Sequence, residues 1–143
     1  MKNKLVHGAR LLLGVIFVVF GANGFLHFLP TPPMSGPPAE FFGALMATGY
    51  MVPLLKGTEV AFGALLVGNR FVPLALTVLA PVIVNIVAFH AFLAPSGIAL
   101  PIVIVALELF LAWSYRGVFR GLLQSRNQPD ASARRENREI LAT

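Results

Sequence analysis

Apolar residues are gathered along this chain into four long runs, which polar or proline-rich stretches separate. The runs cover residues 8–29, 51–68, 71–93 and 98–120. At 1.5 Å per helical residue, each run can cross a hydrocarbon layer of about 30 Å, with 51–68 at the short end. The strict alternation of a membrane barrel is absent, so the runs are helices. The pattern predicts an all-α polytopic membrane protein, a bundle of four transmembrane helices.

The stretch between the first two runs predicts one further, short helix. The prolines from Pro30 to Pro38 prevent regular helix over that part. Glu40 in a first turn, the apolar residues after it and Gly49 as a stop then predict a short helix in the outer membrane interface. This helix either covers the outer end of the bundle or serves only as an interfacial spacer.

Composition agrees with a membrane environment. Hydrophobic residues make up 57% of the chain, charged residues 12%, and the mean hydropathy is +0.78. A soluble domain carries about twice that charged fraction. We therefore expect one transmembrane domain over residues 1–123 and a flexible cytoplasmic tail over residues 124–143.

The basic residues lie beside the runs and predict the orientation of the chain. Residues 30–50 and 94–97 have no Lys or Arg, whereas the opposite ends of the runs carry Lys2, Lys4 and Arg10, then Arg70, and then Arg116, Arg120 and Arg126. Because cytoplasmic flanks are enriched in Lys and Arg, both termini are expected in the cytoplasm. The net charge of +5 then reports topology and attraction to the lipid bilayer, and no nucleic-acid partner is predicted.

The absence of cysteine excludes several chemistries. The chain contains no cysteine. Cysteine is needed for dithiol exchange, a thiolate nucleophile, a cysteine-ligated iron–sulfur cluster and a covalently attached c-type haem. The sequence also has no phosphate-binding glycine loop and no dinucleotide fingerprint between a strand and a helix. Nucleotide chemistry is therefore not expected.

Polar residues interrupt the outer halves of the runs. They are Asn23, His27, Lys56, Glu59, Asn85, His90 and Glu108. Such groups cost several kcal/mol in a membrane unless paired or hydrated, so each is a candidate ligand-binding residue. Counted from the outer end of each run, they lie about 3 to 15 Å deep. The sequence predicts one outer polar cluster to which all four helices contribute.

Helical spacing places some of these residues on shared faces. Lys56 and Glu59 are three residues apart and share one face. Asn85 and His90 are five apart, about 140° around a helix, so they face one site only if the helix is distorted, for which Pro81 is the candidate.

Stripes of small residues predict close helix packing. Gly14 and Gly21 form one stripe on the first run, and a second stripe on the second run consists of Gly57, Ala61, Ala64 and Gly68. Small residues of this kind let membrane helices approach each other closely.

The two carboxylates, Glu59 and Glu108, are the candidates for proton exchange. In one interpretation Lys56 and Glu59 are a self-neutralised pair that makes a short span tolerable. In the other, Glu59 exchanges protons or accepts a hydrogen bond from a ligand. Glu108 has no basic neighbour within one turn of its own run, so it needs Lys56 or His90 from another helix, or it is protonated.

Two histidines of the predicted polar cluster bear on whether the protein binds haem or a metal ion. His27 and His90 lie at similar depth on different helices, as bis-imidazole haem ligation requires. Two interfacial histidines bonded to carbonyls or carboxylates explain the same spacing. With Glu59 and Glu108 they offer metal-ligand types, but no close-spaced ligand motif accompanies them, so no metal site is predicted.

The chain resembles the DoxX family of small four-helix bacterial membrane proteins. The resembling stretches are ARLLLGVIFVVFGANGFLHFL, LLKGTEVAFGALLVGNRFVPLAL, APVIVNIVAFHAFLAPSG and ALELFLAWSYRGVFR. They reach to about Leu123 and contain the polar residues named above. The resemblance implies a bundle in the bacterial inner (cytoplasmic) membrane, in a family whose name comes from a subunit tied to sulfur-compound oxidation and quinone reduction.

Three functions are compatible with these residues. The first is redox-linked binding of a quinone or similar small amphipathic molecule, in which Lys56 or His90 donates a hydrogen bond and Glu59 or Glu108 exchanges protons. The second is a non-catalytic accessory subunit that docks on a membrane protein partner, or a homo-oligomer. The third is transport of protons or a small solute through the two carboxylates.

Overall fold

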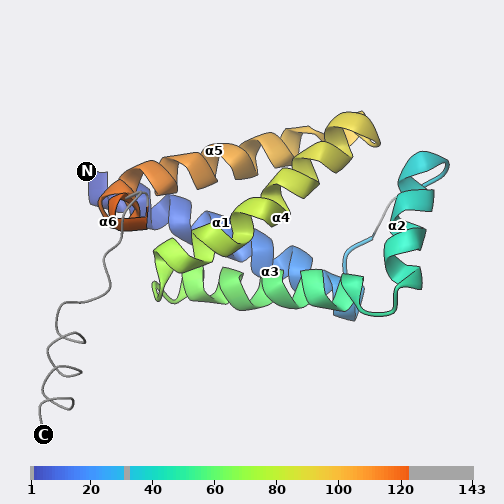
Figure 1. The fold of residues 1–143 in the computed structure, drawn as a ribbon, viewed down its shortest axis with the longest axis horizontal. Helices are drawn as coiled ribbons and strands as arrows, with labels where there is room; N and C mark the ends of the chain where they lie inside the picture. The colour runs from blue at the N-terminus through green and yellow to red at the C-terminus, as the bar shows by residue number, and fades with distance from the viewer. Residues whose placement is uncertain (1, 31–32, 123–143) are drawn as a thin grey trace, which may run out of the picture.

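The structure, a computed structural model, describes residues 2–30 and 33–122. Its elements are α1 (Lys2–Leu26), α2 (Pro37–Ala47), α3 (Met51–Val67), α4 (Val72–Phe92), the 3₁₀ turn η1 (Pro95–Gly97), α5 (Ala99–Ser114) and α6 (Arg116–Leu122) (Figure 1). Within the described residues every regular element is helical, which confirms the all-α prediction. The predicted tail, residues 124–143, lies outside them.

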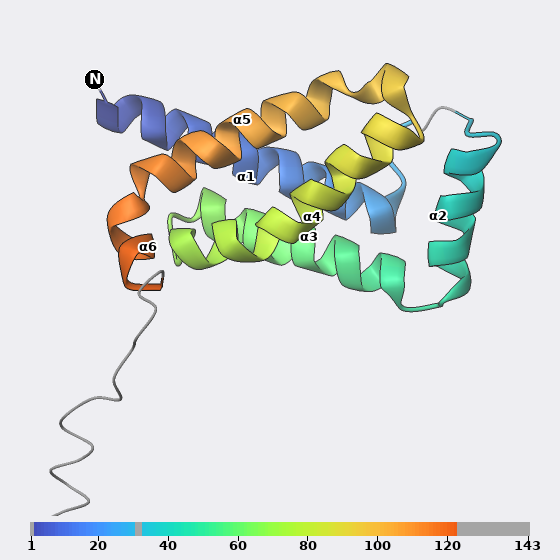
Figure 2. The same ribbon diagram turned by 45° about the horizontal axis from the view of Figure 1, so that its top comes forward.

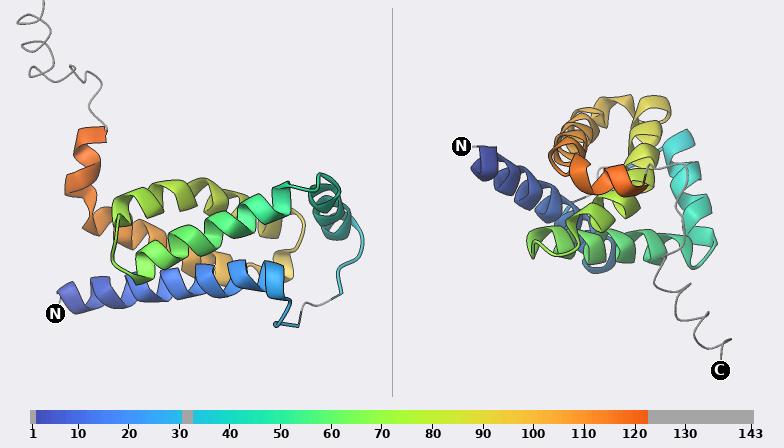
Figure 3. Two further views of the ribbon diagram at one scale, coloured as in Figure 1. Left: turned by 90° about the horizontal axis from the view of Figure 1, so that it is seen from below. Right: turned by 60° about the vertical axis from the view of Figure 1, so that its left-hand side comes forward.

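Four helices pack side by side as a bundle (Figure 3). α1 packs on α3, α3 on α4 and α4 on α5, and α5 returns to α1, so the four close a ring. Apolar side chains fill its interior, and the largest fully buried ones include Leu13, Phe17, Leu66, Leu76, Leu79 and Leu111. The start of α1 and the helix α6 lie at the same end of this bundle (Figure 3).

Two of these helices are long and apolar enough to cross a membrane. They are Asn3–Leu26, with 24 residues, and Val72–Phe92, with 21. α2 and α3 pass the same test only together, as a pair bent by 91°, and α5 is an apolar helix of only 16 residues. The described chain therefore has two helices of spanning length, or three if the bent pair is one span, which indicates a membrane protein.

The predicted run 98–120 is divided into two helices. α5 ends before Tyr115, which has φ −96° and ψ 11°, and α6 turns away from it (Figure 2). The guanidinium of Arg116 lies 5.0 Å from the ring centre of Trp113 and donates a 3.2 Å hydrogen bond to its carbonyl. Gly117, a poor helix former, follows. These residues end the apolar helix earlier than the hydrophobic pattern predicted.

Large apolar side chains cover the outside of the bundle. The exposed fraction is 85% for Phe92, 71% for Leu26 and 70% for Trp113. A soluble protein rarely leaves broad apolar surface in contact with water, whereas lipid chains are as apolar as leucine. The exposed side chains therefore agree with a hydrocarbon surrounding.

The short helix predicted after the first run is present as α2. Pro37 occupies its first turn, where a missing N–H is tolerated, and Glu40 lies in the same turn. Gly49 follows the helix with φ 75°, and the hydroxyl of Thr48 accepts a 3.0 Å hydrogen bond from the N–H of Met51 at the start of α3. α2 lies across the end of the bundle opposite α6 (Figures 1 and 2).

Candidate functional site

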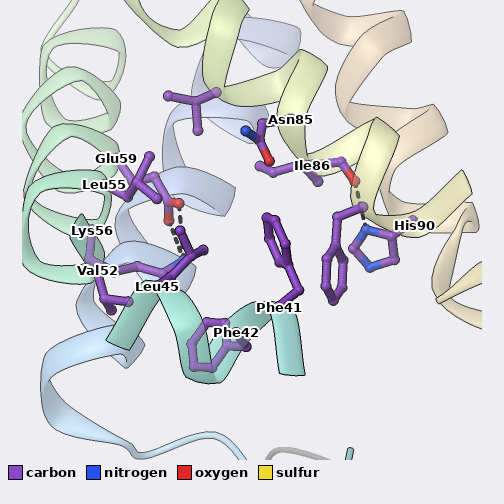
Figure 4. Close-up of a pocket in the computed structure, with 12 residues that line it drawn as sticks. Phe41, Phe42, Leu45, Val52, Leu55, Lys56, Glu59, Asn85, Ile86 and His90 are labelled. Atoms are coloured by element: carbon purple, nitrogen blue, oxygen red, sulfur yellow. Dashed lines mark hydrogen bonds and ion pairs between the residues drawn. The ribbon is translucent and has the colours of Figure 1, made fainter. Parts of the chain in front are cut away.

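A hollow of about 180 Å³ lies where α2 covers the gap between α3 and α4 (Figure 4). We call it the α2 pocket. Its lining comes from Phe41, Phe42 and Leu45 of α2, Val52, Leu55, Lys56 and Glu59 of α3, and Val82, Asn85, Ile86, Phe89 and His90 of α4. The structure thus brings four of the predicted site residues, Lys56, Glu59, Asn85 and His90, to one cavity.

An ion pair forms one side of the α2 pocket. The Nζ atom of Lys56 donates hydrogen bonds to Oε1 and Oε2 of Glu59, at 3.0 and 2.8 Å. The side chains are 24% and 6% exposed, respectively. Because an ammonium group carries three N–H donors and two are used here, Lys56 keeps one donor for a ligand.

Two glycines of α1 let its backbone contact this ion pair directly. A Cβ atom on Gly21 would lie 2.9 Å from Cβ of Glu59 and 2.8 Å from a methyl group of Val60. A Cβ atom on Gly24 would collide with the aliphatic stem of Lys56. Because α1 has no side chain at either position, its backbone packs directly against the two charged residues and limits their rotamers.

The same helix contact continues toward the other end of the bundle. A Cβ atom on Gly14 would lie 2.9 Å from the carbonyl oxygen of Gly63, and one on Gly63 would lie 3.0 Å from that of Gly14. The predicted close approach of the first run is therefore present, but the stripe predicted on the second run does not make it. Ala61 and Ala64 are exposed, and nothing lies within 4 Å of a Cβ on Gly57. Spacing shows which residues share a face but not which face turns inward.

Aromatic rings line the α2 pocket on the side of α4. The ring centres of Phe41 and Phe89 are 5.7 Å apart, and the ring of His90 lies edge-on to Phe89 at 5.3 Å. In Figure 4 the ion pair and His90 lie on opposite sides of the pocket. Phe41 belongs to α2 and the other two to α4, so these rings join the covering helix to the bundle.

His90 has a fixed hydrogen-bond role. Its Nδ1 atom lies 2.8 Å from the carbonyl oxygen of Ile86, which can only accept, so Nδ1 carries the proton. In the neutral ring Nε2 is then an acceptor, and a Cβ atom on Gly97 would lie 3.1 Å from it. Of the two alternative donors named from the sequence, Lys56 and His90, His90 thus uses its Nδ1 proton on Ile86.

Asn85 connects the α2 pocket with a second hollow. This hollow, which we call the α4 groove, has a volume of about 460 Å³. It is lined by Phe41, Pro81, Val84, Asn85, Ala88, Phe89, Phe92 and Leu93. Asn85, Phe41 and Phe89 belong to both hollows. Asn85 and His90 both line the α2 pocket, as predicted, although α4 runs as one helix through Pro81 from Val72 to Phe92.

Asn23 and His27 lie outside this site. The side-chain oxygen of Asn23 accepts a 2.7 Å hydrogen bond from the N–H of Leu29, and its carbonyl accepts one from the N–H of His27 at 2.9 Å. His27 is exposed, with φ 50°. Both residues thus close the end of α1, and His27 does not share a cavity with His90.

Glu108 is also apart from the α2 pocket. It lies on α5, is 8% exposed, and lines a third hollow between α4 and α5. Its Oε2 atom is buried without a hydrogen-bond partner among the described residues. Neither partner suggested by the sequence bonds it, since Lys56 and His90 line the α2 pocket, where Lys56 bonds Glu59 and His90 bonds Ile86.

One buried charge was not recognised as a packing residue from the sequence. Arg10 is only 4% exposed, and its guanidinium donates to the carbonyl oxygens of Leu66 and Val67, the latter at 3.0 Å. These carbonyls are among the last of α3, which have no partner within their own helix. The sequence signal was an arginine inside the first turns of an apolar run, which we had interpreted only as a topology marker.

No group of three or more His, Asp or Glu side chains in the described parts of the chain is arranged to hold a metal ion. Comparisons of the chain with protein-family models, with curated proteins and with solved structures gave no match. The resemblance to the DoxX family accordingly stays a prediction from the sequence.

Proposed function

We propose that this chain is a DoxX-like integral membrane protein that crosses the bacterial inner membrane four times, with both termini in the cytoplasm. The ring of α1, α3, α4 and α5 supports this topology, as does the position of α1's start and α6 at one end (Figure 3). α3 and α5 extend only about 24 to 26 Å, a mismatch that local thinning of a bilayer accommodates. α2 then lies in the outer interface.

We propose further that the α2 pocket binds a quinone or a similar amphipathic molecule. The observation that carries this proposal is that a small pocket with a charged side and an apolar groove lie next to each other and share Phe41, Asn85 and Phe89 as lining. The pocket's 180 Å³ suits one six-membered ring, since a cavity of about 150 Å³ holds benzene. The neighbouring 460 Å³ groove, lined mostly by apolar side chains, suits an alkyl or isoprenoid chain.

The polar side chains supply complementary hydrogen bonds. Lys56 has one N–H donor left for a ring carbonyl, and the amide of Asn85 lies where head and chain would join. Glu59 is the carboxylate of this pocket, so it is the group that would exchange protons with a bound ring in redox-linked binding. Glu108 has no part in this site because it lines a different hollow.

The test is to purify the protein from its native membrane in mild detergent and to quantify bound quinone by mass spectrometry. We expect stoichiometric quinone with the wild type and at least a tenfold loss with Glu59→Gln. Glu40→Gln is the matched control, because Glu40 is an exposed residue of α2. It removes the same charge without touching the pocket.

Two results would end the proposal. One is wild-type protein without quinone, also after incubation with excess ubiquinone or menaquinone in nanodiscs. The other is equal quinone in Glu59→Gln and Glu40→Gln. A stoichiometric protein partner in quinone-free material would instead favour an accessory subunit, and pH-dependent flux in proteoliposomes would favour a transporter.

A further inference from the structure

The third hollow is lined by apolar side chains and by one acid, Glu108, that has a buried oxygen without a hydrogen-bond partner among the described residues. Its volume is about 280 Å³, and Ala80, Ile83, Val84 and Val87 of α4 and Val105 and Leu109 of α5 line it with Glu108. We call it the Glu108 hollow. The Oε2 atom of Glu108 is inaccessible and has no hydrogen-bond partner among the described residues. A buried oxygen without a partner costs about 1 to 3 kcal/mol, so a donor arriving there would be stabilised.

Three basic side chains of the described bundle bond partners other than Glu108. Lys56 bonds both oxygens of Glu59. Arg10 bonds two carbonyls at the end of α3, and the protonated nitrogen of His90 bonds Ile86. A partner for the ionised carboxylate of Glu108 would therefore come from outside this set.

The Glu108 hollow is distinct from the α2 pocket. The two have no lining residue in common, because they use different faces of α4. The rim of the Glu108 hollow includes Val84 and Leu109, which are 68% and 64% exposed. In a membrane, those side chains face lipid, so a molecule dissolved in the bilayer can reach the hollow from the side.

We propose that the Glu108 hollow binds small hydrophobic amines as ammonium ions. An ammonium group offers both a charge opposite to the carboxylate that lines the hollow and N–H donors for it, and ion pairing is strong where water is excluded. The apolar walls take the hydrocarbon part of the ligand. At 280 Å³ the hollow exceeds the roughly 150 Å³ that holds benzene, which leaves room for one ring and an aminomethyl group.

The test uses 4-fluorobenzylammonium, followed by ¹⁹F NMR, with the protein in nanodiscs. We expect saturable binding to the wild type and at least tenfold weaker binding to Glu108→Gln. 4-Fluorobenzyl alcohol is the uncharged probe, and its binding should not depend on Glu108. Empty nanodiscs measure partition into lipid. Glu40→Gln is the matched protein control, since it removes an exposed carboxylate.

A second variant guards against a folding defect in Glu108→Gln. Ala80→Leu keeps the carboxylate and fills the hollow, so it should weaken binding of the amine as well. Helical circular dichroism and gel filtration confirm that both variants are folded. Equal binding to the wild type and Glu108→Gln would overturn the proposal. So would loss of binding in Glu59→Gln alone, which would place the amine in the α2 pocket.

The outcome is independent of the quinone experiment. The α2 pocket and the Glu108 hollow share no lining residue, but Val84 lines both the α4 groove and the hollow, so amine binding is measured on quinone-free protein. Dependence on Glu108 then tests the amine site, and dependence of quinone binding on Glu59 tests the α2 pocket. A pure protein that shows no saturable amine binding would also overturn the proposal. The unpartnered Oε2 atom of Glu108 would then favour a membrane protein partner that inserts a basic side chain.

Discussion

Glu59 and Glu108 are the two buried acids of the described chain, and their surroundings differ in almost every respect. Glu59 bonds Lys56 through both oxygens, and the backbone of α1 packs closely behind it. Glu108 has a buried oxygen with no partner and a hollow of about 280 Å³ beside it. The fold provides Glu59 with a hydrogen-bonded counter-ion, whereas among the described residues it provides no donor for the Oε2 atom of Glu108.

The comparison extends from the two acids to the helix pairs that carry them. At the α1–α3 contact, glycines Gly14 and Gly63 bring two backbones together with no space for a methyl group. At the α4–α5 contact, small and branched side chains such as Ala80 and Val105 leave space. We conclude that the α1–α3 contact leaves no room for a ligand, whereas the α4–α5 contact does.

The largest effect should come from filling the α1–α3 contact. Gly63→Leu places a side chain where even a Cβ atom lies 3.0 Å from a backbone oxygen, and we expect a loss of about 3 kcal/mol in the free energy of unfolding. Unfolding in mixed SDS micelles, followed by circular dichroism, measures it. Gly57→Leu, on the same helix but with nothing within 4 Å, is the matched control. Equal losses in the two variants would contradict our view of this contact.

An intermediate effect should come from breaking the ion pair. Lys56→Met leaves Glu59 buried without its partner, which we expect to cost about 2 kcal/mol. This is less than for a fully buried pair because Lys56 is 24% exposed. The double variant Lys56→Met/Glu59→Leu should recover most of the loss in the same unfolding assay. If the double variant is as unstable as Lys56→Met, the charge on Glu59 is not what makes the single variant unstable.

The smallest effect, and one of opposite sign, should come from removing the other acid. Glu108→Leu eliminates a buried oxygen without a partner, so we expect the protein to become about 1 kcal/mol more stable. Glu59→Leu should instead be destabilising, since it leaves Lys56 unpaired. The two variants carry the same substitution and differ only in surroundings. Destabilisation of both by the same amount would remove the contrast between the two acids.

The sequence predicted well whatever depends on local residue types. Prolines, Glu40 and Gly49 were enough to predict α2, and the apolar runs predicted where α1 and α4 lie. The end of α5 at Ser114 was missed. The hydrophobic pattern continues past that residue, whereas in the structure Tyr115 leaves helical geometry and Arg116 contacts Trp113 across the break.

The candidate site was predicted in part, because depth in the membrane can be counted from the sequence but direction around a helix axis cannot. Glu108 was placed at the depth of Glu59, yet it faces a different hollow. Ile104 and Leu111 share the buried face of α5 with Glu108, so the burial of Glu108 was predictable from helical spacing. Which helix the buried face of α5 packs against depends on how the four helices are arranged in the ring, and only the structure shows this arrangement.

The contact between Arg10 and the end of α3 bears on how the chain enters the bilayer. Arg10 precedes α3 in the chain, so a ribosome delivers the guanidinium before it delivers the carbonyls of Leu66 and Val67. If α1 stays near the insertion machinery, we expect the guanidinium of Arg10 to bond these two carbonyl oxygens as soon as α3 leaves it. Biogenesis would then favour a helical hairpin of α1 and α3 that forms first, onto which α4 and α5 are added later.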